Sequence, residues 1–116
     1  NRTRKVYRPT RKGKNALRRK LQGLLTEPEQ LKWRLHVALH NLHLLDDEEA
    51  SECLRQYREG LTKAIAGYRE LEAFLIKDDR PRHRLQLAIH PIYMLEGELR
   101  WVEDYLAGKE RSGSGR

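Results

Sequence analysis

The feature that most constrains this 116-residue chain is a pair of matched apolar patterns in its second half. In each pattern apolar residues recur at alternating steps of three and four over three heptads, which keeps one helix face against one partner helix. A polar stretch at 76–84 separates the two patterns. We therefore expect two long helices that pack antiparallel within residues 46–108. The seam positions are Leu54, Tyr57, Leu61, Ala64, Tyr68, Leu71 and Leu75, then Leu85, Ala88, Ile92, Leu95, Leu99, Val102 and Leu106.

Start and stop signals divide the chain into further elements. The β-branched and aromatic centre of residues 4–8 predicts a short strand, and Thr10 can cap a helix over 11–25. Thr26 with Glu29, and Asp46 with Glu49, have the spacing of capping boxes, which predicts a second helix to about residue 45 and a third to about 77. A fourth helix runs to about residue 107. The expected fold is all-α, with four helices, a long antiparallel hairpin and one short strand in front.

Two features of the predicted hairpin go beyond its seam. Gly60 and Gly67 flank the third helix's seam, and glycines inside a helix are costly, so we expect them to permit close helix approach. The fourth helix has a second apolar stripe, which needs cover from a second subunit or from the second helix. Pro91 in this stripe is expected to bend the helix. The stripe consists of Leu87, Pro91, Met94, Trp101 and Tyr105.

The net charge of +7 is concentrated at the start of the chain. Ten of the 24 Lys and Arg lie in the first 20 residues without an acid, so one end is expected to face a polyanion. A single cysteine excludes a disulfide framework and indicates a reducing, cytoplasmic compartment. The longest apolar runs are too short to span a membrane, so no membrane partner is expected.

Catalysis and cofactors have little support in the sequence. There is no nucleophile elbow, phosphate-binding loop or paired-carboxylate arrangement, so we expect no enzyme and no cofactor. His36, His40 and His43 have the spacing of one helix face, which can present imidazoles to a metal. No cysteine or carboxylate lies among them, and a polar helix face is the favoured interpretation, so we expect no metal site.

Several motifs together resemble the PadR family of bacterial transcriptional regulators. The stretch Tyr7-Arg8-Pro9-Thr10-Arg11-Lys12-Gly13, followed by Leu17, resembles the signature that closes the family's winged helix, although Pro9 occupies a usually apolar position. Leu25-Thr26-Glu27-Pro28 leading to Arg34 is similar to the linker into the C-terminal domain. Leu99-Arg100-Trp101-Val102-Glu103 is similar to the family's last-helix motif. The branch with a long helical C-terminal domain, as in AphA-like virulence activators, is the most similar.

The resemblance implies an organisation for the chain. Residues 1–10 would end the wing, so the short strand would be wing-like, and 11–25 would be a linker helix. Residues 26–108 would be the helical dimerisation and effector domain, and 109–116 a flexible tail. No helix-turn-helix precedes the wing strand, so we expect the chain to be the C-terminal part of a longer regulator. The expected partners are a second copy and DNA, bound through the winged helix of the intact protein.

Three sets of residues are candidates for these roles. The phosphate contacts would come from the basic start, with a solvated basic stretch as the alternative. The seam residues would pack the hairpin and the dimer. Aromatic residues would either fill the dimer core, which is the favoured interpretation, or contact a small aromatic effector. The phosphate candidates are Arg2, Arg4, Lys5, Arg8, Arg11, Lys12 and Lys14; the packing candidates are the seam residues above other than Ala64 and Ala88; the effector candidates are Trp33, Met94, Trp101 and Tyr105.

The sequence also leaves two other functions open. One is a small basic helical protein that binds nucleic acid non-specifically, and the other is a helical protein–protein adaptor. In the leading hypothesis the dimer sets the spacing of two winged helices on DNA, and a ligand that changes the dimer geometry changes operator affinity.

Overall fold

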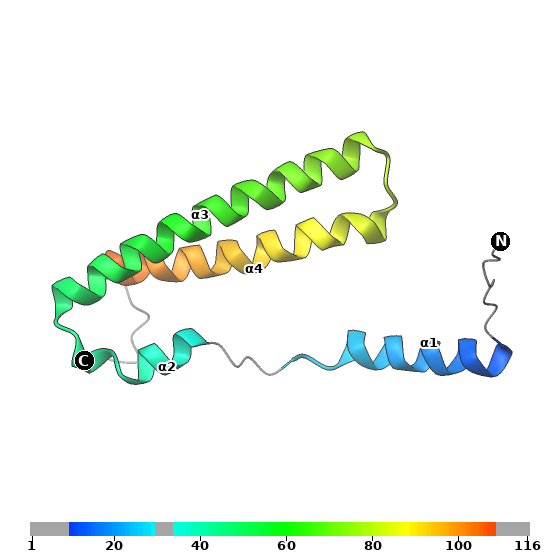
Figure 1. Ribbon diagram of the computed structural model, residues 1–116, viewed down its shortest axis with the longest axis horizontal. Coiled ribbons are helices and arrows are strands. Elements are labelled where there is room, and N and C mark those ends of the chain that lie inside the picture. The colour runs from blue at the N-terminus through cyan, green and yellow to red at the C-terminus, as the bar shows by residue number, and fades with distance from the viewer. Residues whose placement is uncertain (1–9, 30–33, 109–116) are drawn as a thin grey trace, which may run out of the picture. The chain divides into compact units, whose positions relative to one another are not determined.

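The computed structural model describes residues 10–29 and 34–108, and every regular element within these ranges is a helix (Figure 1). This confirms the all-α prediction, whereas the strand predicted at residues 4–8 lies outside the described ranges. The chain divides into two units, Asn1–Leu39 and His40–Arg116, each of which is described by itself. The elements in order are α1 (Arg11–Thr26), α2 (Arg34–His40), the 3-10 helix η1 (Leu42–Leu44), α3 (Asp47–Lys77) and α4 (Arg82–Leu106).

Helix α1 begins where the sequence predicts it, but Thr26, which was expected to cap the next helix, belongs to α1. The Thr10 hydroxyl accepts a hydrogen bond from the Gly13 N–H at 3.0 Å, which satisfies one free donor of the first turn. The predicted capping box at Thr26 is wrong. Thr26 is the last residue of α1, and its hydroxyl donates to the Gln22 carbonyl at 2.8 Å, so it is already used within this helix.

The second predicted helix is also shorter than expected. Helix α2 ends at His40, a turn follows at Asn41, and η1 closes with the Leu45 N–H donating to the Leu42 carbonyl at 3.0 Å. Further along, Asp46 caps α3 in an extended conformation with φ −76° and ψ 169°, which separates α3 from the helical turns before it.

The start of α3 confirms the predicted capping box. The Glu49 N–H donates to the Asp46 carboxylate at 2.8 Å, and the Asp46 N–H donates back to the Glu49 carboxylate at 3.0 Å. Three acidic residues in the first turn also stabilise α3, because their negative charge lies at the positive end of the helix dipole. The sequence therefore determines this boundary through local hydrogen bonds alone.

A Schellman turn joins the two long helices. The Arg80 N–H donates to the Leu75 carbonyl and the Asp79 N–H to the Ile76 carbonyl, both at 3.0 Å. Asp79 has a φ of +54°, a left-handed conformation that aspartate tolerates better than most residues. Pro81 then caps α4 without needing a hydrogen-bond donor of its own.

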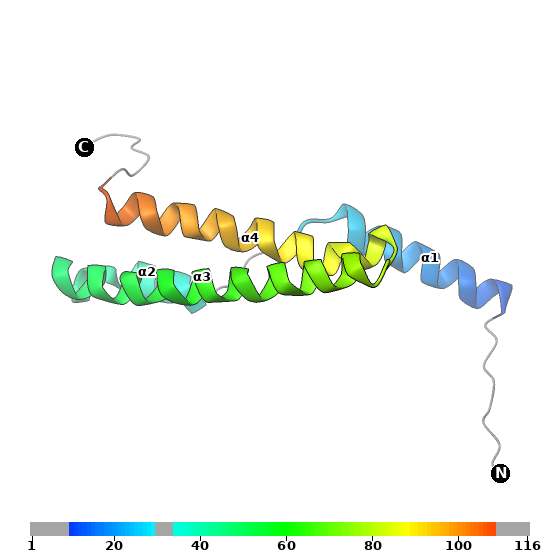
Figure 2. The same ribbon diagram turned by 90° about the horizontal axis from the view of Figure 1, so that it is seen from above.

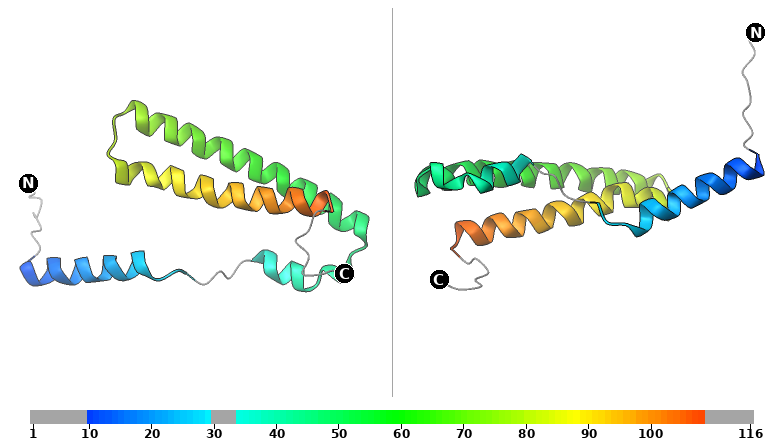
Figure 3. Two further views of the ribbon diagram at one scale, coloured as in Figure 1. Left: turned by 180° about the vertical axis from the view of Figure 1, so that it is seen from behind. Right: turned by 90° about the horizontal axis from the view of Figure 1, so that it is seen from below.

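Helices α3 and α4 pack antiparallel along their length, and the views from above, behind and below show the same pairing (Figures 2 and 3). Three positions of the predicted seam are exposed, Ala64, Tyr68 and Leu71, and Ile65 is buried in place of Ala64. A strict heptad drifts by about 20° against a straight helix, and the eleven-residue step from Leu54 to Ile65 corrects that drift. The buried core consists of Ala50, Leu54, Leu61, Ile65, Ala88, Ile92 and Val102.

One further expectation about the hairpin changes, and the bend at Pro91 stays a prediction. Gly60 and Gly67 do not bring α3 and α4 close together, because a Cβ built on either would meet none of the described atoms within 4 Å. Both glycines lie on the exposed side of α3. Helix α4 continues through Pro91 as a single element, although the proline removes one backbone donor.

Replacing the cap of α3 should measurably destabilise the hairpin. We expect Asp46→Ala to lower the free energy of unfolding by about 1 kcal/mol, because the first-turn N–H groups lose their acceptor. Asp47→Ala is the matched control, since Asp47 lies in the same acidic turn outside the capping box. Urea unfolding followed by helical circular dichroism measures both, and an equal loss for the two variants would contradict the importance of the box.

Candidate functional site

The hairpin has two broad faces, one on each side of its seam. On one side the Tyr57 hydroxyl donates to Glu98, and on the other the Arg69 guanidinium pairs with Glu96. Because each interaction links α3 to α4, it identifies which side of one helix continues into which side of the other. The two faces can therefore be assembled from helical spacing.

We call the Tyr57–Glu98 side the open face. It combines residues at steps of three and four beyond Tyr57 with the second stripe of α4. Its side chains are small or apolar, and several are far from buried: Phe74 is 59% exposed and Leu87 63%. Among the residues grouped here only Glu98 has a formal charge, and Lys63, three residues after Gly60 and four before Gly67, borders them on α3. The open face consists of Gly60, Ala64, Gly67, Leu71 and Phe74 of α3 and Leu87, Pro91, Met94, Glu98, Trp101 and Tyr105 of α4.

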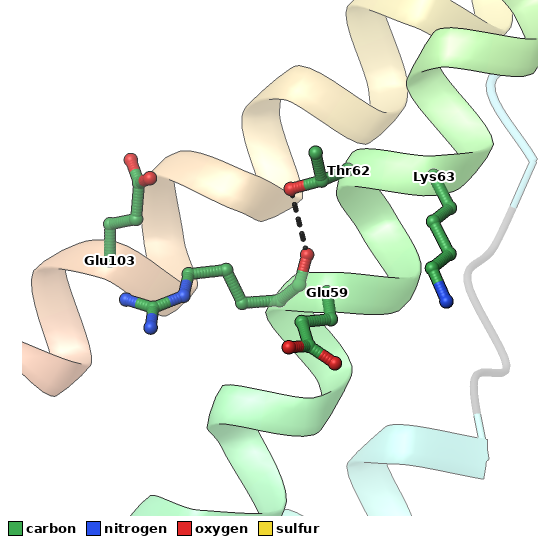
Figure 4. A pocket seen from close by; sticks show the side chains of 5 residues that line it. Glu59, Thr62, Lys63 and Glu103 are labelled. Carbon is green, nitrogen blue, oxygen red and sulfur yellow. Dashed lines mark hydrogen bonds between the residues drawn. The ribbon is translucent and has the colours of Figure 1, made fainter.

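The opposite side, which we call the charged face, has a different character. Besides the Arg69–Glu96 pair it has an open hollow of about 480 Å³ lined by charged and polar side chains. Figure 4 shows Glu59, Thr62 and Lys63 on α3 and Glu103 on α4 around it. The Thr62 hydroxyl donates to the Arg58 carbonyl at 3.0 Å. Cations and carboxylates are mixed here, so the hollow has no single-sign field that would select a ligand. Its lining is Arg58, Glu59, Thr62, Lys63 and Glu103.

The Tyr57–Glu98 pair is the polar centre of the open face. The hydroxyl-to-carboxylate distance is 2.5 Å, to Oε1 of Glu98. Burial, and then the hydrogen bond to the nearby carboxylate, raise the pKa of Tyr57 to about 12. The second oxygen, Oε2 of Glu98, is buried and has no hydrogen-bond partner among the described residues. Glu98 thus has one carboxylate oxygen with a hydrogen-bond donor and one that is covered without a donor.

The predicted effector residues that lie within the described ranges share this face. Met94 is exposed, whereas Trp101 and Tyr105 are half-buried and pack against the core cluster around Leu54 and Val102. The Trp101 and Tyr105 rings contact each other with centroids 6.1 Å apart and planes tilted by 44°. Trp33 lies outside the described residues. The structure thus brings three of the four candidates to one helix.

Three of the seven basic candidates lie within the described residues. Arg11, Lys12 and Lys14 lie at the start of α1 with their side chains exposed. This helix has no acidic residue, and its further cations are Arg18, Arg19 and Lys20. The other side of α1 is apolar, with Leu17, Leu21 and Leu24 exposed. The candidates Arg2, Arg4, Lys5 and Arg8 lie outside the described residues.

The predicted packing residues occupy the seam to different degrees. Tyr68 and Leu71, 36% and 38% exposed, lie at its margin. Buried members are Leu54, Leu61, Ile92 and Val102, and half-buried members are Tyr57, Leu75, Leu85, Leu95, Leu99 and Leu106.

The described residues form neither a group that could hold a metal ion nor a helix that could span a membrane. His36 and His40 lie on α2 while His43 lies in η1, so the three histidines do not share one helix face as predicted. No three His, Cys, Asp or Glu of residues 10–29 and 34–108 are grouped so as to hold a metal ion. None of the helices described is long and apolar enough to cross a membrane.

Glu98 is a residue of this face that was not predicted from the sequence. The signal was present in the second stripe, whose spacing jumps by seven between Met94 and Trp101. Glu98 fills that gap at steps of four and three, which places a carboxylate in an otherwise apolar row. Its partner Tyr57 was assigned only to packing, because a tyrosine at a seam position does not reveal where its hydroxyl goes.

The raised pKa of Tyr57 predicts a specific loss of stability at high pH. The unfolded tyrosine ionises near pH 10 and the folded one near 12, so its stabilising contribution is present below pH 10 and is lost as the pH rises towards 12. We expect the urea midpoint to fall more steeply over this range in the wild type than in Tyr57→Phe. Parallel curves for the two proteins would contradict the bond to Glu98.

Comparison with known proteins gives no match to a protein-family model, a curated protein or a solved structure.

Proposed function

We propose that this chain is the helical dimerisation region of a PadR-like DNA-binding transcriptional regulator. In this proposal the open face of the hairpin pairs with a second copy, and the basic start of the chain faces DNA phosphates. The observation that carries the proposal is the contrast between the two faces of the hairpin. Within the hairpin, one face is charged and has an ion pair between the helices, and the other is apolar across both helices.

The size of the open face supports a protein partner. From Leu87 to Tyr105, α4 extends about 27 Å at 1.5 Å per residue, and two packed helices are about 20 Å wide. That footprint of roughly 500 Å² is of the same order as the ~800 Å² of accessible surface that each partner contributes to a specific interface. Small side chains at Gly60, Ala64 and Gly67 leave room for another helix to approach α3 closely.

The chemistry of the open face favours a second copy as the partner. An apolar face suits a partner surface that is also apolar, and the open face of a second copy is such a surface. A two-fold pairing of the same surface is also the commonest way in which soluble chains associate. A different helical protein is the alternative occupant.

The charge of α1 supports the second half of the proposal. Exposed cations without an acid between them favour phosphate contact, and such contacts position a protein on DNA without selecting its sequence. A dimer would present two such basic segments to one DNA molecule. A ligand bound between the copies, near Met94 and Trp101, would then alter DNA affinity by favouring one dimer geometry.

A charge placed on the open face should abolish pairing. We expect Ala64→Glu to raise the dimer dissociation constant at least about 100-fold, because the new carboxylate would be desolvated beside an apolar partner. Ala66→Glu is the matched control, since Ala66 is exposed on the same helix but turned away from the open face. Sedimentation equilibrium measures both, and equal dissociation constants for Ala64→Glu and the wild type would contradict the proposal.

Phosphate contact should appear in the salt dependence of DNA binding. For the combined variant Arg11→Ala, Lys12→Ala and Lys14→Ala we expect the slope of log K against log salt to become shallower by up to about 2.7, since each lost contact contributes roughly 0.9. The control removes Arg58, Lys63 and Arg100 of the hairpin instead. An unchanged slope for the α1 variant would contradict the proposal, and equal affinity for RNA and DNA duplexes would favour the non-specific alternative.

A further inference from the structure

We propose that α1 is a membrane-surface helix, which lies along an anionic bilayer with its leucine side chains inserted between the lipids. We call these leucines, Leu17, Leu21, Leu24 and Leu25, the leucine row. The inference concerns the unit Asn1–Leu39 by itself. It goes beyond the proposed function and does not rest on the pairing of the hairpin.

The leucine row consists of apolar side chains that contact with DNA does not use. Its first three members recur at steps of four and three, and Leu25 follows Leu21 by four, so the row lies on one side of α1. All four side chains are exposed, Leu24 to 70% and Leu25 to 86%. Phosphate contacts involve the cations of α1 and would leave the leucines in water. The row therefore indicates a second kind of surface as its partner.

The charges of α1 favour a surface that is both apolar and anionic. Six of its 16 residues are Lys or Arg, and none is acidic. Arg19 lies on the opposite side of the helix from the leucine row. Lys14, three residues before Leu17, and Lys20, three residues after it, border the row, and long Lys side chains can keep their ammonium groups among lipid headgroups. A row of Leu beside many Lys and Arg is typical of helices that lie in a bilayer surface.

The same charges disfavour two other environments for the leucine row. Two copies of α1 packed row to row would bring Lys14 and Lys20 close to like charges, and α1 has no acid to offset them. With 16 residues, six of them charged, α1 is too short and too polar to span a bilayer. The expectation of no membrane partner rests on the lack of a spanning run, and a helix in the surface needs none. An acidic groove on another protein is the alternative cover.

The number of cations is large enough for one helix to attach to a bilayer. Clusters of about four to eight Lys and Arg on an amphipathic helix are typical of binding to anionic lipids, and α1 has six. Each cation near such a surface strengthens binding by roughly fivefold. Insertion of the leucine row adds to this attraction, because each buried methylene favours the bilayer by roughly fourfold. Charge and apolar side chains therefore favour the same surface.

The test measures binding of the full chain to vesicles of phosphatidylcholine mixed with phosphatidylserine, and to vesicles of phosphatidylcholine alone. We expect the chain to sediment with the anionic vesicles and to stay in solution with the neutral ones. The combined variant Leu17→Gln and Leu21→Gln should lower the partition coefficient at least about tenfold. Leucine and glutamine have similar helix propensities, so the variant retains α1. Leu44→Gln with Ile76→Gln is the matched control, since both residues are exposed in the other unit.

The outcomes separate this inference from the proposed function. A chain that ignores anionic vesicles would overturn the inference in favour of the acidic groove. Equal vesicle binding by the leucine variant and the wild type would also overturn it, because attraction of charges alone would then suffice. The leucine variant should bind duplex DNA as the wild type does, since it keeps every cation. Failure of the wild type to bind DNA would contradict the proposed function, whereas the vesicle result would still decide the role of the leucine row.

Discussion

The packing of α3 on α4 is the constraint from which the other features of the hairpin follow. Each helix has one strip of side chains in the seam, and two helices side by side enclose only that strip. The core is therefore narrow, and apolar residues outside it remain in contact with solvent. On one side the chain balances this with charge pairs such as Arg69–Glu96. On the other side the same physics leaves an apolar surface that a third layer would normally cover.

The sequence predicts the parts of this fold that depend on local chemistry. Thr10 and Asp46 cap their helices because the acceptor and the donors lie within three residues of each other. The hairpin follows from apolar spacing, for which both helices have long runs. The capping box predicted at Thr26 and Glu29 does not form, because the Thr26 hydroxyl donates to the Gln22 carbonyl of its own helix instead. The spacing of Thr26 and Glu29 alone does not show which of the two bonds forms.

The candidate site is less predictable, because it depends on how two distant segments come together. Ala64 and Ile65 both suit a seam, and only the actual path of α3 against α4 decides between them. The glycines illustrate the same limit. Gly60 indicates close approach in general, but the spacing does not say whether α4 or another chain approaches. The link between Tyr57 and Glu98 joins residues 41 positions apart, so neither residue alone reveals it.

The Schellman turn at Asp79 has a consequence for how the length of the connecting loop can vary. Pro81 caps α4 directly after the turn, so the short connection limits which residues of α4 can lie opposite which residues of α3. A longer loop would let α4 shift along α3 by one helical turn, about 5.4 Å, with the same side still in the seam. The apolar stripe of α4 would then lie opposite other residues of α3. The length of the loop therefore determines which residues of the two helices form one face.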